Sequence, residues 1–295
     1  MSDPPPTEST PTAPTSPEAP PSAAKSPPAL PPGLRPLTIS APFGNYIRPE
    51  GCTATLGTFT VEDRPGRPWR IAKTVRYYPR LKAWVNQIGL RNPGIGYVQR
   101  KADAGKLDLS DKLVSVHGFN DADWQYLLQR IAELRPMGVE LNMSCPNVGH
   151  INWPRRLFAD ALATGVPVVV KLPPVNYRMM ADAALEQGVR VFHACNTLPV
   201  PAGGLSGAPL KPVALQCVRD LRQHAGSGEL HLIAGGGIRC PQDLTDYHEA
   251  GADSFAVGTI VMNPMLLFSH ARVQPLRERA EALASLTTSA ATDDI

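Results

Sequence analysis

One short segment concentrates side chains that can do chemistry. Residues 139–148 read Val-Glu-Leu-Asn-Met-Ser-Cys-Pro-Asn-Val, an apolar run that leads into a hydroxyl, a thiol and two carboxamides. Polar side chains at this density make a poor core, but they suit a loop that holds a polar, planar ligand. The thiol of Cys145 can act as a base once it is deprotonated, since an ordinary thiol has a pKa near about 8.5. We therefore expect a catalytic site here.

Glycines mark three further segments. Gly203-Gly204-Leu205-Ser206-Gly207, Gly235-Gly236-Gly237 and Gly258-Thr259 each come after an apolar run. Glycine lets backbone N–H groups approach phosphate oxygens closely, although any one of these clusters alone is more typical of a turn. Three clusters at neighbouring strand ends predict a phosphorylated cofactor.

Two ionisable side chains lie within apolar runs. Lys171 must be paired or serve a ligand, and we favour a ligand because the nearby predicted strand ends carry amides and not acids. His193 is predicted to be a hydrogen-bonded structural histidine. His150 follows the Cys145 loop without an assigned role. The remaining cysteines lack polar neighbours and are predicted to be packing residues: Cys52, Cys195, Cys217 and Cys240.

Eight short apolar runs alternate with helical patterns. After Asn120, a predicted N-cap, apolar residues recur at the spacing of one helix face from Trp124 to Leu134, and a second such face runs from Ala214 to Leu221. Strand and helix repeated in this way predict a closed parallel (β/α)8 TIM barrel, whose chemistry sits where the strands end. The expected strands are 37–41, 55–60, 113–117, 139–142, 166–172, 191–194, 230–234 and 254–257.

Composition indicates the domain organisation and argues against several classes of ligand and location. Proline occupies 12 of the first 32 positions, so residues 1–35 are predicted to be a disordered leader, a solubilising tail rather than an adaptor ligand, before a barrel domain of residues 36–295. The net charge of +3 is too small and scattered for nucleic-acid binding. Five scattered cysteines indicate neither disulfides nor zinc, and no metal site is expected. Without an apolar run of roughly 18 residues or a signal peptide, a cytoplasmic location away from membranes is expected.

Taken together, the motifs resemble a known family. Residues 142–147, 170–174, 196–197, 203–207 and 235–237, in this order and spacing, resemble the dihydroorotate dehydrogenases, and the similarity runs from about Leu37 to Leu283. This resemblance implies an FMN-containing barrel that oxidises dihydroorotate to orotate in pyrimidine biosynthesis. The cysteine resembles the base of the soluble class, while the membrane-associated class uses serine.

The resemblance also assigns roles residue by residue. Cys145 resembles the base and Lys171 a flavin-ring contact. The substrate ring would be bound by Asn86, Asn142, Asn147, Asn196 and Thr197, and its carboxylate by main-chain groups of Gly89 and Leu90. The FMN would be bound by Asn142 and Lys171 and, at its phosphate, by Gly207, Gly236, Gly237, Gly258 and Thr259.

One family feature is missing. A second lysine is expected at a position that aligns with Gly57 or near Asn45, and neither residue is lysine. Arg48, Lys73 and Arg91 are the candidates to replace this cation.

Two alternatives therefore stay open. The chain could oxidise an uncharged dihydropyrimidine with FMN, or bind flavin without turnover. The electron acceptor is not assigned, and a homodimer or an electron-transfer subunit is a further expectation.

Overall fold

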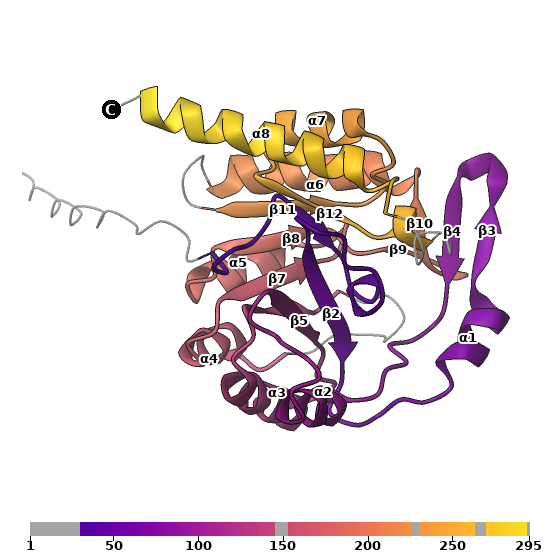
Figure 1. Ribbon diagram of the computed structural model, residues 1–295, viewed down its shortest axis with the longest axis vertical. Coiled ribbons are helices and arrows are strands. Elements are labelled where there is room, and N and C mark those ends of the chain that lie inside the picture. The colour runs from indigo at the N-terminus through magenta and orange to yellow at the C-terminus, as the bar shows by residue number, and fades with distance from the viewer. Residues whose placement is uncertain (1–29, 145–152, 226–229, 263–269, 294–295) are drawn as a thin grey trace, which may run out of the picture.

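A closed barrel forms the centre of the molecule. The structure, a computed structural model, describes residues 30–144, 153–225, 230–262 and 270–293. Its parallel strands close in the order β1-β12-β11-β8-β7-β6-β5-β2 (Figure 1). These strands are β1 (Leu37–Ile39), β2 (Thr53–Phe59), β5 (Lys112–Val116), β6 (Gly138–Asn142), β7 (Val168–Leu172), β8 (Val191–Ala194), β11 (His231–Gly235) and β12 (Ser254–Val257). The predicted barrel is confirmed, and each of the eight predicted strands overlaps one of them.

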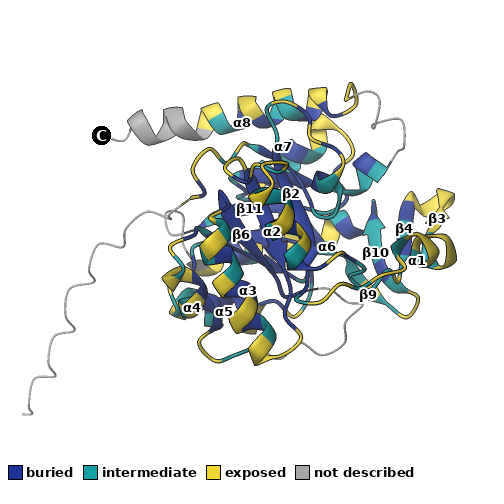
Figure 2. Cartoon of the chain, turned by 60° about the horizontal axis from the view of Figure 1, so that its bottom comes forward, coloured by how far each residue is buried: buried dark blue, intermediate teal, exposed yellow. Residues whose placement is uncertain are grey.

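Helices cover the outside of the barrel, and their outward faces are exposed (Figure 2). They are α2 (Ile95–Asp103), α3 (Asp121–Leu134), α4 (Leu157–Ala163), α5 (Arg178–Glu186), α6 (Leu210–Ala225), α7 (Pro241–Glu249) and α8 (Gln274–Asp293). As predicted, Asn120 caps α3, because its side chain accepts a hydrogen bond of 2.9 Å from the backbone N–H of Asp123. The predicted apolar faces of α3 and α6 are buried, for example at Trp124 and Val218.

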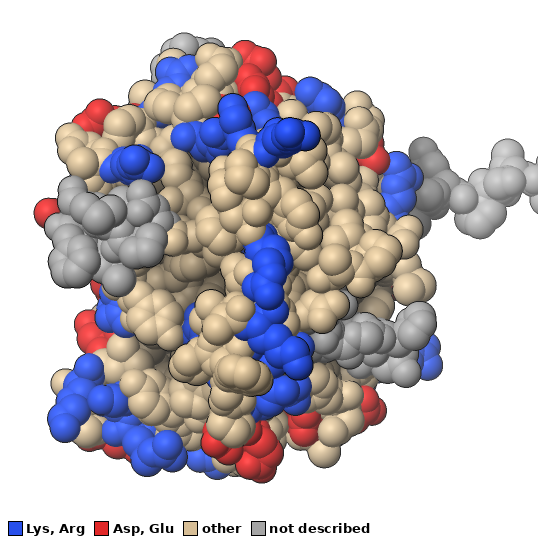
Figure 3. Space-filling view, turned by 90° about the vertical axis from the view of Figure 1, so that its right-hand side faces the viewer, with Lys and Arg blue, Asp and Glu red and all other residues tan. Residues whose placement is uncertain are grey.

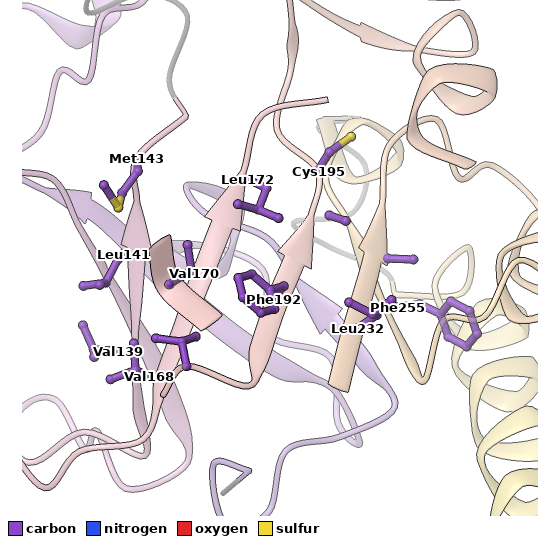
Figure 4. Close-up of a cluster of buried hydrophobic side chains, with 14 of the residues drawn as sticks. Val139, Leu141, Met143, Val168, Val170, Leu172, Phe192, Cys195, Leu232 and Phe255 are labelled. Carbon is purple, nitrogen blue, oxygen red and sulfur yellow. The ribbon is translucent and has the colours of Figure 1, made fainter. Parts of the chain in front are cut away.

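Alternate residues of each strand point to opposite sides of the barrel wall. Val139, Leu141, Val168, Val170 and Phe192 belong to the apolar layer that packs with the helices (Figure 4). A separate cluster fills the lower interior of the barrel, toward the amino ends of the strands, and reaches up to Ala256 near the end of β12. Its other members are Leu113, Met137, Val169, Val191 and Ile233. The same alternation places polar residues in the upper interior, which lies toward the carboxyl ends of the strands.

A second sheet was not predicted. It is antiparallel, in the order β3-β4-β10-β9, and consists of β3 (Arg76–Tyr78), β4 (Ala83–Asn86), β9 (Leu198–Val200) and β10 (Gly203–Gly207). Helix α1 (Arg67–Thr74) precedes it, and both lie to one side of the barrel (Figure 1). The glycine cluster at 203–207, predicted only as part of a phosphate site, is thus a strand of this sheet. A Cβ at Gly203 would collide with the backbone oxygen of Asn86, so glycine here permits close packing against β4.

The chain contacts the barrel before residue 35. Pro31 is buried, and Leu34 packs against the lower interior cluster. Most of the predicted leader, residues 1–29, lies outside the described residues, so the leader and the domain boundary stay predictions. In the described part of the chain, no helix combines the length and the hydropathy needed to span a bilayer.

Candidate active site

A cavity of about 280 Å³ lies at the carboxyl ends of the barrel strands, between the barrel and the second sheet. Eleven of the predicted site residues line it, although they come from distant parts of the chain: Asn86, Gly89, Leu90, Asn142, Lys171, Asn196, Thr197, Gly236, Gly237, Gly258 and Thr259. This is the end of a parallel barrel where catalytic groups gather. The structure therefore brings the predicted residues together, while their roles stay predictions.

Three buried ionisable residues lie together at the floor of the cavity. Glu140 of β6 is fully buried, with one carboxylate oxygen 2.7 Å from His193 Nδ1 and the other 4.0 Å from Lys171 Nζ. Burial alone would raise the pKa of Glu140, but Lys171 and His193 outweigh it and lower the pKa to about 2. The carboxylate is ionised at neutral pH and partly balances Lys171.

This group corrects one prediction. Pairing of Lys171 with a neighbouring carboxylate was disfavoured because the strand ends carry amides, but Glu140 lies two residues before the end of β6 and reaches Lys171 from the adjacent strand. Lys171 nevertheless lines the cavity, so it faces both an acid and the ligand space. His193 is hydrogen-bonded, as predicted, and its partner is Glu140.

Above this floor, side-chain amides are held in fixed orientations. Asn142 Nδ2 donates to Thr58 Oγ1 at 2.7 Å, and Asn142 Oδ1 accepts from Asn196 Nδ2 at 3.1 Å. The backbone carbonyl of Asn142 is also bonded to His117 Nδ1, at 2.7 Å. A ligand would therefore meet amides already oriented by the protein, which lowers the entropic cost of binding.

The chain reaches the rim of this cavity just before the cysteine loop. Ser144 is buried, and its Oγ accepts a hydrogen bond of 3.1 Å from Asn196 Nδ2. Cys145, Asn147 and His150 lie outside the described residues, so the structure does not test their predicted roles.

The described cysteines behave differently from one another. Cys217 is buried, as predicted for a packing residue, and Cys52 is half-buried. Cys240 is exposed at the N-terminus of α7, so the packing prediction is wrong there, because the residue precedes the helix rather than lying on its buried face. Cys195 lines the cavity, but burial raises its pKa to about 12. Its thiol is consequently a poor base at neutral pH.

The loop after β4 forms another wall. Gly89 and Leu90 both have positive φ angles, of 72° and 53°. The carbonyl oxygen of Leu90 accepts a hydrogen bond from Asn92 Nδ2 at 2.7 Å, and that of Gly89 accepts from Arg64 Nη2 at 3.3 Å. These hydrogen bonds fix the orientation of both carbonyl groups.

The positions of the missing lysine lie side by side. Asn45 Nδ2 donates to the carbonyl of Gly57 at 3.0 Å, and the Gly57 N–H donates to Asn45 Oδ1 at 3.2 Å. Gly57 lines the cavity with a φ of 109°, and a Cβ there would collide with the backbone oxygen of Ser115. This backbone excludes any side chain at residue 57.

Arginines supply positive charge at the cavity instead. Of the three candidates, Arg91 lines the cavity, whereas Arg48 donates to the backbone of Gly44 and, like Lys73, is not part of the lining. Arg67 of α1 also lines it, with its guanidinium stacked on Tyr46 and donating to the Tyr46 hydroxyl at 2.8 Å. Within the described residues, the lining includes no Asp or Glu. Figure 3 shows a band of Lys and Arg side chains across the face that carries α1 and β3.

The glycines at the ends of β11 and β12 serve two purposes. Gly236 and Gly237 have positive φ, and a Cβ at Gly237 would lie 2.8 Å from the carbonyl oxygen of Gly207 and 3.0 Å from the backbone nitrogen of Lys211, so close packing alone requires glycine. At Gly258 the nearest atom to an added Cβ is 3.8 Å away, which leaves the backbone open to the cavity. Gly207 lies behind Gly237 and is not part of the lining.

Comparison with known proteins decides the family. The family model for dihydroorotate dehydrogenase matches residues 46–272, most of the chain and all of the cavity lining except the loop after β1. The chain belongs to the dihydroorotate dehydrogenase family. The predicted family is thereby confirmed, and with it an oxidoreductase that uses a flavin; members of the family bind FMN.

Two curated relatives of this dihydroorotate dehydrogenase family member are named as catalytic subunits. It is 32% identical over 237 residues to the catalytic subunit of dihydroorotate dehydrogenase B (NAD(+)) from Latilactobacillus sakei, covering 69% of this chain and 75% of the relative. The corresponding protein from Staphylococcus carnosus is 33% identical over 210 residues, 62% of this chain and 68% of the relative. A crystal structure of dihydroorotate dehydrogenase from Eimeria tenella with ferulenol shares the fold, with a TM-score of 0.66 at 20% identity, covering 85% and 82% of the two chains.

Sequence reasoning missed two residues at this candidate site, Glu140 and Arg67. Glu140 could have been found, because it shares a face of its strand with Asn142 two residues later. Arg67 carries no comparable signal. It lies in a polar, proline-containing segment, and only the position of α1 over the cavity brings it to the ligand space.

Proposed function

We propose that this protein oxidises dihydroorotate to orotate with FMN as its cofactor. The observation that carries the proposal is the convergence of Asn86, Asn142 and Asn196 with Lys171 on one cavity whose far wall is made of glycine strand ends. Three amides can hydrogen-bond the ring of a dihydropyrimidine, and a buried cation suits a cofactor that becomes negatively charged on reduction.

The residues present fit FMN. The open backbone at Gly258 and the glycines at 236 and 237 provide a wall where N–H groups can approach a phosphate, and Lys171 faces the space that a ring would occupy. When bound, FMN supplies the acceptor for the hydride that leaves carbon 6 of the substrate. The protein holds the ring through Lys171 and Asn142 and keeps the amides oriented.

Proton removal is assigned to Cys145 on the strength of the family resemblance. Its thiolate takes the proton from carbon 5, the C5–H electron pair becomes the new C5=C6 double bond, and the hydride leaves carbon 6. Asn147, Asn196 and Thr197 are proposed to bind the substrate ring.

Arg91 and Arg67 are proposed to provide the positive charge that the missing lysine would give. Both line the cavity, Arg91 directly after the Gly89-Leu90 turn whose N–H groups are assigned to the substrate carboxylate. Replacement of a charged hydrogen bond costs about 1.5 to 3 kcal/mol, or roughly 10- to 150-fold in affinity. Arg91→Gln should therefore raise KM for dihydroorotate by at least about tenfold, with Lys73→Gln, outside the cavity, as the matched control.

A second substrate class has one observation in its favour. Asn45 and Gly57 are both uncharged and bond to each other, so neither position supplies a cation, and an uncharged dihydropyrimidine would need none. Flavin bleaching by dihydroorotate and by dihydrouracil separates the two. Bleaching by dihydroorotate that weakens in Arg91→Gln supports our proposal, whereas bleaching by dihydrouracil alone contradicts it. A flavin that neither compound reduces would favour a binding protein without turnover.

The electrons must then leave the protein. Since the relatives are named as catalytic subunits of NAD(+)-dependent enzymes, we propose that this chain also works with a separate electron-transfer subunit. Co-purification of a second flavoprotein or iron–sulfur protein with the tagged full chain would support this assignment. The cytoplasmic location and a homodimer stay predictions.

A further inference from the structure

His193 has two ends with different surroundings. Its Nδ1 bonds Glu140 at 2.7 Å in the buried floor. Its Nε2 lies 3.2 Å from the place where Gly235 would carry a Cβ, and both residues line the cavity. Because Gly235 has no side chain, Nε2 faces the ligand space. Within the described chain, no hydrogen bond to this nitrogen is formed.

The protonation of the ring follows from its neighbours. Glu140 is ionised, so it accepts the hydrogen bond and Nδ1 carries the proton. Burial first, and then the charge of Lys171, lower the pKa of His193 below its ordinary 6.5 against the opposing effect of Glu140. The ring is therefore neutral at pH 7, and Nε2 presents a lone pair to the cavity. The charged groups that face it are Glu140 of β6 and Lys171 of β7, while β11 contributes the uncharged Ile233 and Gly235.

Lys171 and His193 are register partners on adjacent strands. The floor thus presents a donor and an acceptor next to each other, with Lys171 paired at 4.0 Å and His193 hydrogen-bonded to the same carboxylate. Such a pair is complementary to a planar ring edge on which a carbonyl stands beside an N–H, and an isoalloxazine has this edge.

We propose that His193 Nε2 accepts a hydrogen bond from a ring N–H of bound flavin, beside the hydrogen bond that Lys171 donates to an adjacent ring carbonyl. Glu140 acts as a positioning residue that sets the tautomer of His193 and the place of Lys171. The inference rests on the proposed binding of FMN, but not on which dihydropyrimidine is oxidised.

Two isosteric variants separate the two ends of the ring. His193→Asn can keep the hydrogen bond to Glu140 but lacks an atom at Nε2, whereas His193→Gln places an amide at Nε2 but gives up the Nδ1 position. One neutral hydrogen bond is worth about 3- to 10-fold in affinity. We expect release of FMN from the diluted holoprotein, followed by flavin fluorescence, to show about fivefold weaker binding in His193→Asn and less than about twofold in His193→Gln. The reverse order would overturn the proposal, since it would mean that His193 acts only through Glu140.

Binding as a function of pH gives a second readout. Riboflavin serves as the probe for the flavin-free full chain, because it lacks a phosphate that itself titrates near about pH 6. Wild-type affinity should be constant above about pH 6.5 and fall as the pH drops below it, because Nε2 loses its lone pair when it is protonated, and His193→Gln should be flat. Equal pH profiles of the wild type and His193→Gln would contradict the proposal.

A ligand without the ribityl chain tests the ring assignment. His193→Asn should weaken the binding of lumiflavin, which has only the ring, as much as that of riboflavin. An effect confined to riboflavin would overturn the ring assignment. Failure of all variants and wild type to bind any flavin would instead refute the proposed function.

Discussion

The two halves of the barrel interior are built from the same strands but from opposite chemistry. Val169, Val191 and Ile233 fill the lower half, and two residues further along each strand stand Lys171, His193 and Gly235. The lower half needs only volume, and side chains interdigitate there. The upper half holds ionised groups away from water, which is tolerated only because each one meets a partner. A step of two residues along a strand thus leads from the part of the interior that stabilises the fold to the part that lines the ligand cavity.

The largest expected effect concerns Glu140, in the upper half of the interior. Glu140→Ala leaves Lys171 buried without its partner and His193 without its acceptor, so we expect the free energy of unfolding to fall by about 3 to 5 kcal/mol. Urea denaturation of the flavin-free chain measures it. Glu140→Gln is the matched control for volume and should still be destabilised, since it removes the charge alone. A loss below about 1 kcal/mol in Glu140→Ala would mean that the upper half does not depend on its ion pairs.

A substitution in the lower half should lower the free energy of unfolding but leave FMN binding unchanged. Ile233→Val removes one buried methylene on the strand that pairs with β8 at His193, which should cost about 1 kcal/mol of unfolding free energy. FMN release should be unchanged, because the cavity begins one layer above. Comparable weakening of FMN binding in Ile233→Val and His193→Asn would show that the halves are not independent.

The smallest expected effect is the dependence of stability on pH. Burial lowers the pKa of both His117 and His193 below the ordinary 6.5, so the unfolded chain binds protons that the folded chain does not. The free energy of unfolding should therefore be fully retained above pH 6.5 and fall as the pH drops below it. Glu140, with its pKa lowered to about 2, adds a further loss below about pH 4.5. In unfolding titrations, Ile233→Val should keep the slope below pH 6.5 and His193→Gln should reduce it.

The barrel could be predicted from the sequence, whereas the second sheet could not. Parallel strands that are buried on both faces have continuous apolar sequences, and each such sequence predicted here forms a strand of the barrel. The second sheet left no such trace: β3 is exposed, and β10 is rich in glycine because it lies against β4. Its strands β4 and β10 pair although more than a hundred residues separate them in the chain, so no local pattern marks them.

The site divides in the same way. Asn142, Lys171 and Asn196 could be predicted because strand ends in a barrel meet at one rim. The pairing of Lys171 with Glu140 depends on the register between β6 and β7, and the place of Arg67 on the docking of α1. Neither can be derived from spacing along the chain.

The most direct test of the central claim is anaerobic mixing of the purified holoprotein with dihydroorotate, followed by the flavin absorbance. Wild type should bleach, and Cys145→Ser should bleach at least about 100-fold more slowly at neutral pH, because a hydroxyl is a far weaker base than a thiolate. Wild type that stays yellow, or a Cys145→Ser variant that bleaches at the wild-type rate, would contradict the account.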